Sequence, residues 1–325
     1  REGAAEMILH RLELLPGEHL GAVAGRMHVL SIHGTFTATV KALGLGSPPI
    51  RPQRLSHADD MALDAIFRAK GIAQPWQTHG YGHYLTPFLS LPEQGMLMSA
   101  LAGHTPLRLR VTGQNNVQHR YWRWCTDCIA EDQDTQGMPY YHRDHQLPGA
   151  FHCHRHQRGL SGRCVGCGFV AMVLSELPIP PYDNLCPHCG HWMGGYDGHF
   201  TERMREIELA SLALVQSGCS LTLSTLTGYV REAMGISGEA MRTVKSIKAI
   251  NAWFQQMDAQ CDPQALTAYF TNSEGDGQGW QLPPQLRNAR GYHEQSARDP
   301  LHPLVHLLML QHAGVDLMGL LRSEG

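Results

Sequence analysis

Cys164-Val-Gly-Cys167 and Cys186-Pro-His-Cys189 form two Cys-x-x-Cys knuckles that are separated by eighteen residues. This spacing is typical of a zinc ribbon, in which each knuckle turns tightly enough to aim both sulfurs at one tetrahedral ion. Gly166, Gly168 and Gly190 supply backbone freedom where such turns need it. The stretch therefore predicts a small zinc-ribbon module in which four thiolates close around one zinc ion.

A second set of ligands lies upstream, so that seven of the nine cysteines fall within the 65 residues from Cys125 to Cys189. Cys125-Thr-Asp-Cys128 is followed after twenty-four residues by Cys153-His-Arg-His156. Three sulfurs and one imidazole nitrogen would complete a Cys3His zinc site. His152 and His154 compete for the fourth position. We prefer His156 because it repeats the two-residue gap of the other half-sites.

Structural zinc is one of three explanations for these cysteines. Disulfides need an oxidising compartment, and no secretory signal occurs in the first thirty residues, so we expect no disulfides. Cys219 and Cys261 lie apart from the cluster, and we expect them to be buried thiols. A catalytic zinc ion keeps one coordination position open for water, whereas each set here supplies four protein ligands and leaves no open position. A zinc-dependent hydrolase or nuclease would need an acid or base close to that water, and the nearest candidates are Asp127, Asp144 and His145.

Composition excludes several other classes of protein. The chain has 325 residues, of which 42% are hydrophobic and 17% charged, and this is enough for a sizeable core and two or three domains. Its net charge of −3 excludes a polycation that coats nucleic acid by charge alone. No apolar run approaches the roughly 20 residues that span a bilayer, and no phosphate-binding Gly-x-x-x-x-Gly-Lys or Gly-x-Ser-x-Gly motif occurs.

The N-terminal region has the periodicity of helices. Apolar residues spaced along one helical face predict a helix over 18–29, and a second over 35–43 would complete a helix-turn-helix. Further helices are expected over 58–69 and 92–101, before an alternating strand at 107–111. A generic helical bundle without a nucleic-acid role explains the same pattern.

The C-terminal region is predicted to be helical over 201–215, 221–234 and 238–257. The last of these helices carries Arg242, Lys245 and Lys248 at three-residue spacing, so it resembles the basic second helix of another helix-turn-helix. A solvated stripe of charge is the alternative. The closing stretch, His302 to Leu310, is too densely apolar for a solvent-exposed helix and should be buried.

Arginine and aromatic residues alternate around the first cysteine pair. Arg120-Tyr-Trp-Arg-Trp124 leads into it, and Tyr140-Tyr-His-Arg143 lies between its two halves. Arginines beside aromatic rings can contact bases and phosphates, so Arg120 and Arg143 are candidate nucleic-acid contacts. We assign Tyr121 and Trp122 to the core of the module instead.

These patterns predict a mainly α fold with small zinc-ribbon modules. We expect an N-terminal helix-turn-helix-like domain at 1–117, tandem zinc-binding modules at 118–195 and a C-terminal helical domain at 196–325.

The cysteine region resembles the TniQ/TnsD family. The resemblance rests on Trp124-Cys-Thr-Asp-Cys128, Tyr141-His-Arg143, Cys153-His-Arg-His156 with Leu160, and the knuckle at Cys164. Leu15-Pro-Gly-Glu-His-Leu20 is similar to the family's N-terminal segment, and Asp299 to Leu308 is similar to a motif of its longer members. One departure is His145, which stands roughly where the family usually has tryptophan.

The resemblance implies a non-catalytic adaptor for DNA transposition. Family members link a target-recognition element, either an RNA-guided CRISPR effector or target DNA read directly, to an AAA+ ATPase that recruits the transposase. The near-neutral charge favours the guide-dependent adaptor over the direct reader. We expect such a protein in the bacterial cytoplasm, at the nucleoid during transposition. The sequence is compatible with a monomer or a homodimer. Exposed side chains of the first predicted helix, Glu18 and Arg26, are candidate contacts to the ATPase.

Overall fold

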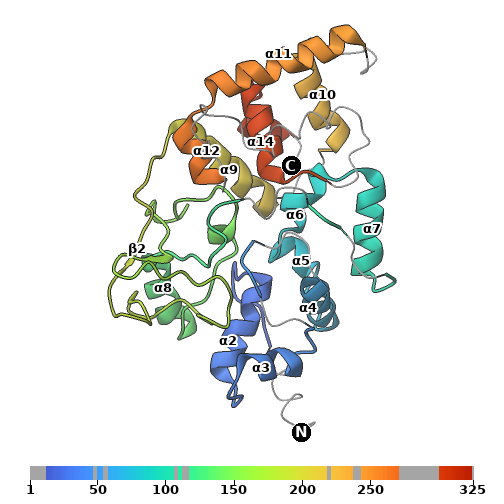
Figure 1. Ribbon diagram of the computed structural model, residues 1–325. Helices are drawn as coiled ribbons and strands as arrows, with labels where there is room; N and C mark the ends of the chain where they lie inside the picture. Colours follow the sequence, from blue (N-terminus) through green and yellow to red (C-terminus); the bar gives the residue numbers. More distant parts are fainter. Residues whose placement is uncertain are drawn as a thin grey trace. The chain divides into compact units, whose positions relative to one another are not determined.

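The computed structural model (Figure 1) describes residues 12–46, 50–53, 58–105, 109–111, 117–217, 221–236, 243–270 and 300–323. The chain divides into two compact units. Unit 1 consists of Arg1–Gly82, Ala100–Leu107 and His119–Gly198, and unit 2 of His83–Ser99, Arg108–Gln118 and His199–Gly325. The division into three domains stays a prediction.

Unit 1 combines short helices with the two cysteine modules. The first module joins the start of a helix to a tight turn, and the second consists of turns and a minimal antiparallel ribbon. The elements of this unit are the 3-10 helix η1 (Leu20–Ala22), α2 (Val23–Leu30), α3 (Phe36–Ala42), α4 (Ala58–Ala69), α5 (Pro75–Thr78), α8 (Thr126–Gln136), the 3-10 helix η4 (Asp144–Gln146), β1 (Arg163–Cys164) and β2 (Met193–Gly194).

The predicted N-terminal helix-turn-helix is present in unit 1. Thr35 ends the turn and caps α3, because its hydroxyl accepts a hydrogen bond from the Ala38 amide at 3.2 Å. His28 of α2 reaches Thr39 of α3, with 2.9 Å between imidazole Nδ1 and the hydroxyl oxygen. The first predicted helix, 18–29, begins as the single turn η1 and becomes α-helical at Val23.

The N-terminal segment is bound to the cysteine modules by backbone contacts. The His19 amide donates to the Tyr141 carbonyl at 2.8 Å, and the Arg143 amide donates to the Gly17 carbonyl at 2.8 Å. Gly25 of α2 lies directly against the Pro178 carbonyl, and a Cβ atom at this position would overlap it. The first five residues of α2, Val23 to Met27, are therefore buried, in part by chain that lies far away in the sequence, whereas Val29 and Leu30 are exposed.

Unit 2 is helical. Pro303–His312 forms α14, whose residues Pro303 to Leu310 are all buried, as predicted for the closing apolar stretch. α14 packs against α9 and α10. The other elements of this unit are α6 (Gly82–Leu85, which starts at the boundary), η2 (Thr86–Phe88), α7 (Leu91–Leu101, whose last two residues belong to unit 1), α9 (Glu202–Ser217), α10 (Leu223–Ala233), α11 (Val244–Gln260), α12 (Pro263–Tyr269) and α15 (Leu317–Ser323).

The mainly α prediction is confirmed, with one local error. Residues 109–111 form no strand, and the rest of the predicted strand at 107–111 lies outside the described residues. Five alternating residues are too short a pattern to distinguish a strand from extended chain. In the part of the chain that the structure describes, each helix is too short or too polar to span a membrane.

Candidate metal centres

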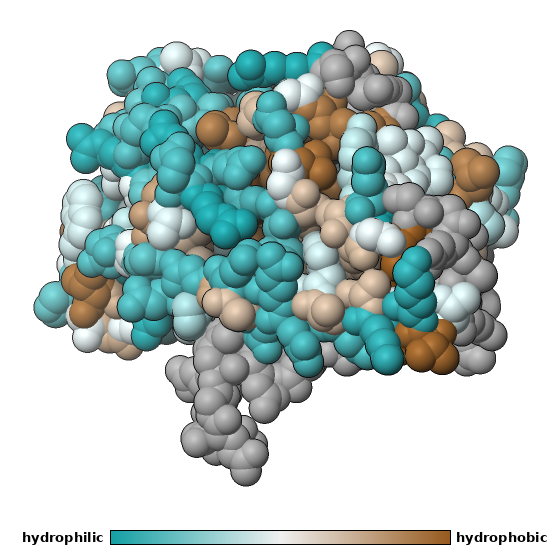
Figure 2. Space-filling view, turned by 90° about the horizontal axis from the view of Figure 1, so that it is seen from above, coloured by the Kyte–Doolittle hydropathy of each residue, from teal (hydrophilic) through white to brown (hydrophobic). Residues whose placement is uncertain are grey.

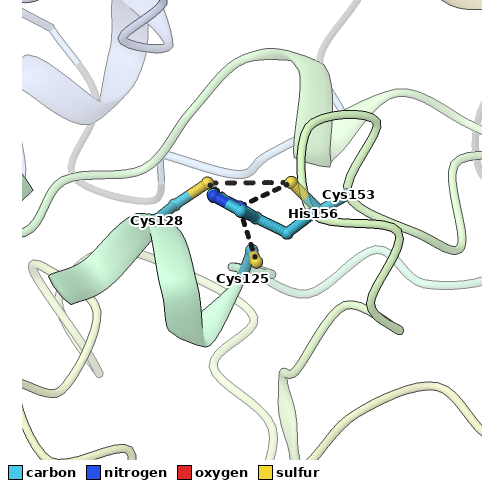
Figure 3. Close-up of side chains that lie close together, drawn as sticks. All are labelled: Cys125, Cys128, Cys153 and His156. Atoms are coloured by element: carbon cyan, nitrogen blue, oxygen red, sulfur yellow. Dashed lines mark hydrogen bonds between the residues drawn. The ribbon is translucent and has the colours of Figure 1, made fainter. Parts of the chain in front are cut away.

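The first centre joins a helix N-terminus to a tight turn in unit 1. Cys125 is the N-cap residue of α8, and Cys128 lies in the first turn of that helix. Cys153 and His156 come from the turn that follows Phe151, and Figure 3 shows all four side chains converging on one point. The four ligand atoms lie within 4.8 Å of one another. The structure thus favours His156 over His152 and His154 as the fourth member of the set.

The spacing of these atoms fits a tetrahedral ion. Zinc bonds of about 2.3 Å to sulfur and 2.1 Å to nitrogen require S···S separations of about 3.8 Å and S···N separations of about 3.6 Å at tetrahedral angles. Nδ1 of His156 lies 3.5 Å from the sulfurs of Cys125 and Cys128 and 3.6 Å from that of Cys153. The sulfurs of Cys128 and Cys153 are 3.7 Å apart. Four of the six separations thus match a tetrahedral ion and all six are under 4.8 Å, so the set could hold a metal ion.

The second centre is the predicted set of four cysteines. The sulfurs of Cys164 and Cys189 are 3.4 Å apart, and those of Cys167 and Cys186 are 3.7 Å apart. All four sulfur atoms lie within 4.8 Å of one another. A disulfide requires about 2.05 Å between sulfurs, so no cysteine in either cluster is paired in this way.

One kind of turn shapes three of the four half-sites. Gly168 and Gly190 follow the two knuckles with φ of 74° and 71°, and their amides donate to the carbonyls of Cys164 and Cys186 at 3.0 and 2.9 Å. Gln157 takes this position after His156, with φ of 54°, and its amide N–H donates a hydrogen bond of 2.8 Å to the Cys153 carbonyl. Cys125 and Cys128 instead use the start of α8, where the helix dipole stabilises thiolates.

The two centres are parts of one folded unit. Trp124, next to Cys125, donates its indole N–H to Oδ1 of Asn184 at 2.6 Å. The Asn184 amide group then donates to the Met193 carbonyl in β2 at 2.9 Å. Trp124 also exchanges two backbone hydrogen bonds with Ser161, of 3.0 and 2.8 Å. Because Asn184 is buried, the first module and the ribbon are held together by a shielded polar bridge.

Crowding of thiols makes the first centre electrostatically unusual. The neighbouring sulfurs share negative charge unequally: hydrogen bonds with Cys125 and Cys153 raise the pKa of Cys128, whereas hydrogen bonds with Cys125 and Cys128 lower the pKa of Cys153. A divalent cation among the sulfurs reverses the direction for Cys128, since coordinating thiols lose their protons. The donor set therefore suits a bound cation better than a cluster of free thiols.

Glu131 supports the histidine ligand from outside the cluster. Its Oε1 lies 3.0 Å from Nε2 of His156, which leaves Nδ1 facing the three sulfurs. A carboxylate in this position fixes the imidazole tautomer and its orientation toward a metal. Arg155 forms an ion pair with the other oxygen of Glu131. The sequence contained a usable signal, because Glu131 follows Cys128 by three residues on α8 and so lies one helical turn away.

We expect Glu131→Ala to weaken metal binding at the first centre by about 10–100-fold, because the imidazole loses the group that orients it. Competition with a chromogenic chelator measures this as easier release of one metal ion per chain. Asp134→Ala is the matched control, since Asp134 is an exposed carboxylate on the same helix. Equal metal affinity of the two variants would remove Glu131 from the site.

The alternative catalytic residues do not form an open metal position. Asp144 pairs with Arg143, 2.9 Å from its Nη2, and Asp127 pairs with Arg158 at 2.6 Å. His145 is buried, and Nε2 lies 3.8 Å from the Cys128 sulfur. Burial lowers the pKa of His145 well below its usual value, so its neutral ring can donate one hydrogen bond to a Cys128 thiolate. Its proximity to the sulfur was not anticipated from the sequence.

The candidate nucleic-acid contacts are scattered. Arg143 is buried and uses its guanidinium on Asp144 and the Thr78 carbonyl, so the prediction that it contacts nucleic acid is wrong. Arg120 is half-buried. Lys245 and Lys248 are exposed on α11, whereas Arg242 lies outside the described residues.

The predicted partner contact through Glu18 and Arg26 is also wrong. Both side chains are buried, at 0% and 4% exposure. They form an ion pair with two hydrogen bonds, from Nε of Arg26 to Oε1 of Glu18 at 2.8 Å and from Nη2 to Oε2 at 3.0 Å. They are inaccessible because the chain around Pro178 and the chain around Tyr141 pack against this part of the N-terminal segment. The pair holds the segment in place: Oε2 of Glu18 also accepts the Leu15 amide at 3.0 Å.

The comparisons with known proteins agree with the resemblance in sequence. No curated protein matches this chain. Residues 9–160 match the model of the TniQ family. The matched segment includes α2, α3 and the complete first metal centre, while the second centre follows it. TniQ proteins belong to systems of DNA transposition and target selection. The chain thus carries a TniQ domain, which spans the segment that holds the helix-turn-helix and the first metal centre.

Proposed function

We propose that the protein is a non-catalytic target-selection adaptor for DNA transposition, with one structural zinc ion in each cluster. It would link a target-recognition element to an AAA+ regulator that recruits the transposase, and it would act on DNA in the bacterial cytoplasm. The observation that carries the proposal is the match of residues 9–160 to the TniQ family, which takes in the helix-turn-helix and the first centre together.

The chemistry of the ligands supports zinc in a structural role. Thiolate and imidazole ligands in tetrahedral sets are typical of zinc, and four protein ligands leave no position for a reacting water. Bound zinc would supply folding energy to both modules, because binding of the ion is coupled to their folding. Glu131 orients the His156 ligand through a hydrogen bond, and Asn184 joins the two modules through its hydrogen bond with Trp124.

The backbone connections suggest how an adaptor is kept rigid. The N-terminal segment hydrogen-bonds to Tyr141 and Arg143, which lie between the two halves of the first centre in the sequence. Metal binding would therefore stabilise the attachment of the N-terminal segment as well as the module itself. A rigid helix-turn-helix presents a defined surface to partners, and this reduces the entropic cost of binding.

A reconstituted complex tests the adaptor role. We expect the tagged, zinc-loaded full chain to retain the AAA+ regulator encoded with it, in the presence of ATP and the CRISPR effector with its guide RNA. Transposition at the guided site should be lost when the protein is left out. Retention of neither component, with transposition unchanged on omission, would contradict the proposal. Tight binding of one duplex by the protein alone would instead favour the direct reader of target DNA.

A further inference from the structure

Arg155 stands between two ligands of the first centre, Cys153 and His156, and its side chain contacts two residues of α8. Its Nη1 donates to the sulfur of Cys128 at 3.8 Å, and its Nη2 pairs with Oε2 of Glu131. Oε1 of the same carboxylate lies 3.0 Å from Nε2 of His156, and Nδ1 of that ring lies 3.5 Å from the Cys128 sulfur. The contacts therefore form a closed ring that begins and ends at one ligand sulfur.

The Cys128 sulfur lies near two side-chain donors. Besides Arg155, Nε2 of His145 lies 3.8 Å from it. Sulfur is larger than oxygen, so hydrogen bonds to a thiolate are longer than the roughly 2.9 Å typical of N–H···O. A charged donor strengthens such a bond, and a guanidinium is always charged. Arg155 is thus suited to stabilise the negative charge of a thiolate at this position.

A second ion pair joins the same two segments of chain and serves as a comparison. Arg158, just after the turn, pairs with Asp127 of α8 at 2.6 Å, and in the described part of the chain these two side chains bond to no ligand. Hydrophilic residues predominate on the face shown in Figure 2, so an exposed ion pair is ordinary here and contributes little by itself. The pair of Arg155 and Glu131 differs, because each partner also contacts a ligand.

We propose that Arg155 is a positioning residue of the first centre, which slows the loss of its metal ion. This inference rests on the structural zinc ion of the proposed function. The guanidinium holds the Glu131 carboxylate against His156 and also donates to Cys128. Neither ligand can therefore detach without breaking a contact with this pair. Outer groups that orient ligands typically change metal affinity by about 10–100-fold.

Release of zinc to an excess of chromogenic chelator tests this role on the full chain. The kinetic phase that disappears in Cys167→Ser belongs to the second centre and is the internal reference. We expect Arg155→Ala to speed release from the first centre about tenfold and to leave the reference phase unchanged. Arg158→Ala is the matched control and should leave both phases as in the wild type. Arg155→Lys keeps the charge but lacks the planar fork, so it should recover only part of the loss.

Two further measurements distinguish positioning from general stability. If the guanidinium acts through Glu131, the effects of Arg155→Ala and Glu131→Ala overlap, and the double variant should release metal more slowly than the product of the two single effects predicts. In protein loaded with Co²⁺, Arg155→Ala should shift the sulfur-to-cobalt charge-transfer band to lower energy. The reason is that a thiolate that loses a hydrogen-bond donor gives electron density to the metal more readily. A residue that only stabilises the fold would leave the position of this band unchanged.

Equal acceleration by Arg155→Ala and Arg158→Ala would overturn the inference, because any ion pair between the two segments would then suffice. So would unchanged release from the first centre, independent effects in the double variant, or an unchanged cobalt band. If the wild type holds two ions and Arg155→Ala behaves like it, only the role of Arg155 fails. A wild type without metal in the first centre would overturn both this inference and the structural zinc ion on which it rests. Retention of the AAA+ regulator by the wild type tests the adaptor role independently.

Discussion

Cys125→Ser should reduce the zinc content from two ions to one per chain and should unfold the first module. Structural zinc sites contribute about 10–16 kcal/mol of apparent binding free energy, which is also folding free energy. This is as large as the whole stability of a typical domain, about 5–15 kcal/mol, so we expect the loss of one ligand to unfold the module. Elemental analysis of purified protein measures the stoichiometry, and thermal unfolding measures the loss of stability.

Cys261→Ser is the matched control for this experiment. Cys261 is a free, half-buried thiol in unit 2 and belongs to neither cluster, so two zinc ions should remain. Cys167→Ser should remove the other ion and leave the first centre loaded. Two ions in Cys125→Ser would exclude the first centre as a zinc site.

The effect of Cys125→Ser should extend to the N-terminal helices. The amides of His19 and Arg143 join the N-terminal segment to chain between the two halves of the first centre. Hydrogen exchange of α2 should therefore rise in this variant, and it should stay as in the wild type in the control Cys261→Ser.

The metal clusters were the most predictable part of the fold. Ligand spacing is local information, and it selected the same eight residues that the structure brings together. Helices were also predicted to within a few residues, as at Ala58–Ala69 and Leu91–Leu101. Glu131 was missed because its role depends on where His156 turns, and this follows from the fold of a segment 25 residues away.

The N-terminal helix shows where reasoning from sequence failed. Apolar spacing over 18–29 predicted one buried face, and the charged residues Glu18 and Arg26 were assigned to the other. In the structure, the contact between Gly25 and the Pro178 carbonyl covers that second face as well. No local pattern reveals a contact between residues so far apart in sequence. A charged residue on a short helix therefore gives no reliable sign of exposure unless its surroundings are known.

Arg26→Met should destabilise the folded protein by about 3–5 kcal/mol, because it leaves the fully buried Glu18 carboxylate without its partner. Burial already raises the pKa of Glu18 above its ordinary value of 4.5, and the Arg26 guanidinium opposes that shift. Chemical denaturation at constant zinc loading measures the change. Arg158→Met is the exposed control: its ion pair with Asp127 lies at the surface, where such pairs contribute about 0–1 kcal/mol.

The double variant Glu18→Gln/Arg26→Met distinguishes an unpaired charge from lost packing. Removing both charges should recover much of the stability that Arg26→Met loses, because no ion is then left in the interior. The deficit of Arg26→Met should also depend on pH. Loss of the guanidinium raises the folded-state pKa of Glu18 further, so the deficit is smallest below the unfolded pKa and grows as pH rises through the folded pKa. A small deficit that is independent of pH would show that the carboxylate reaches water, and Glu18 and Arg26 would again be candidates for a surface that partners contact.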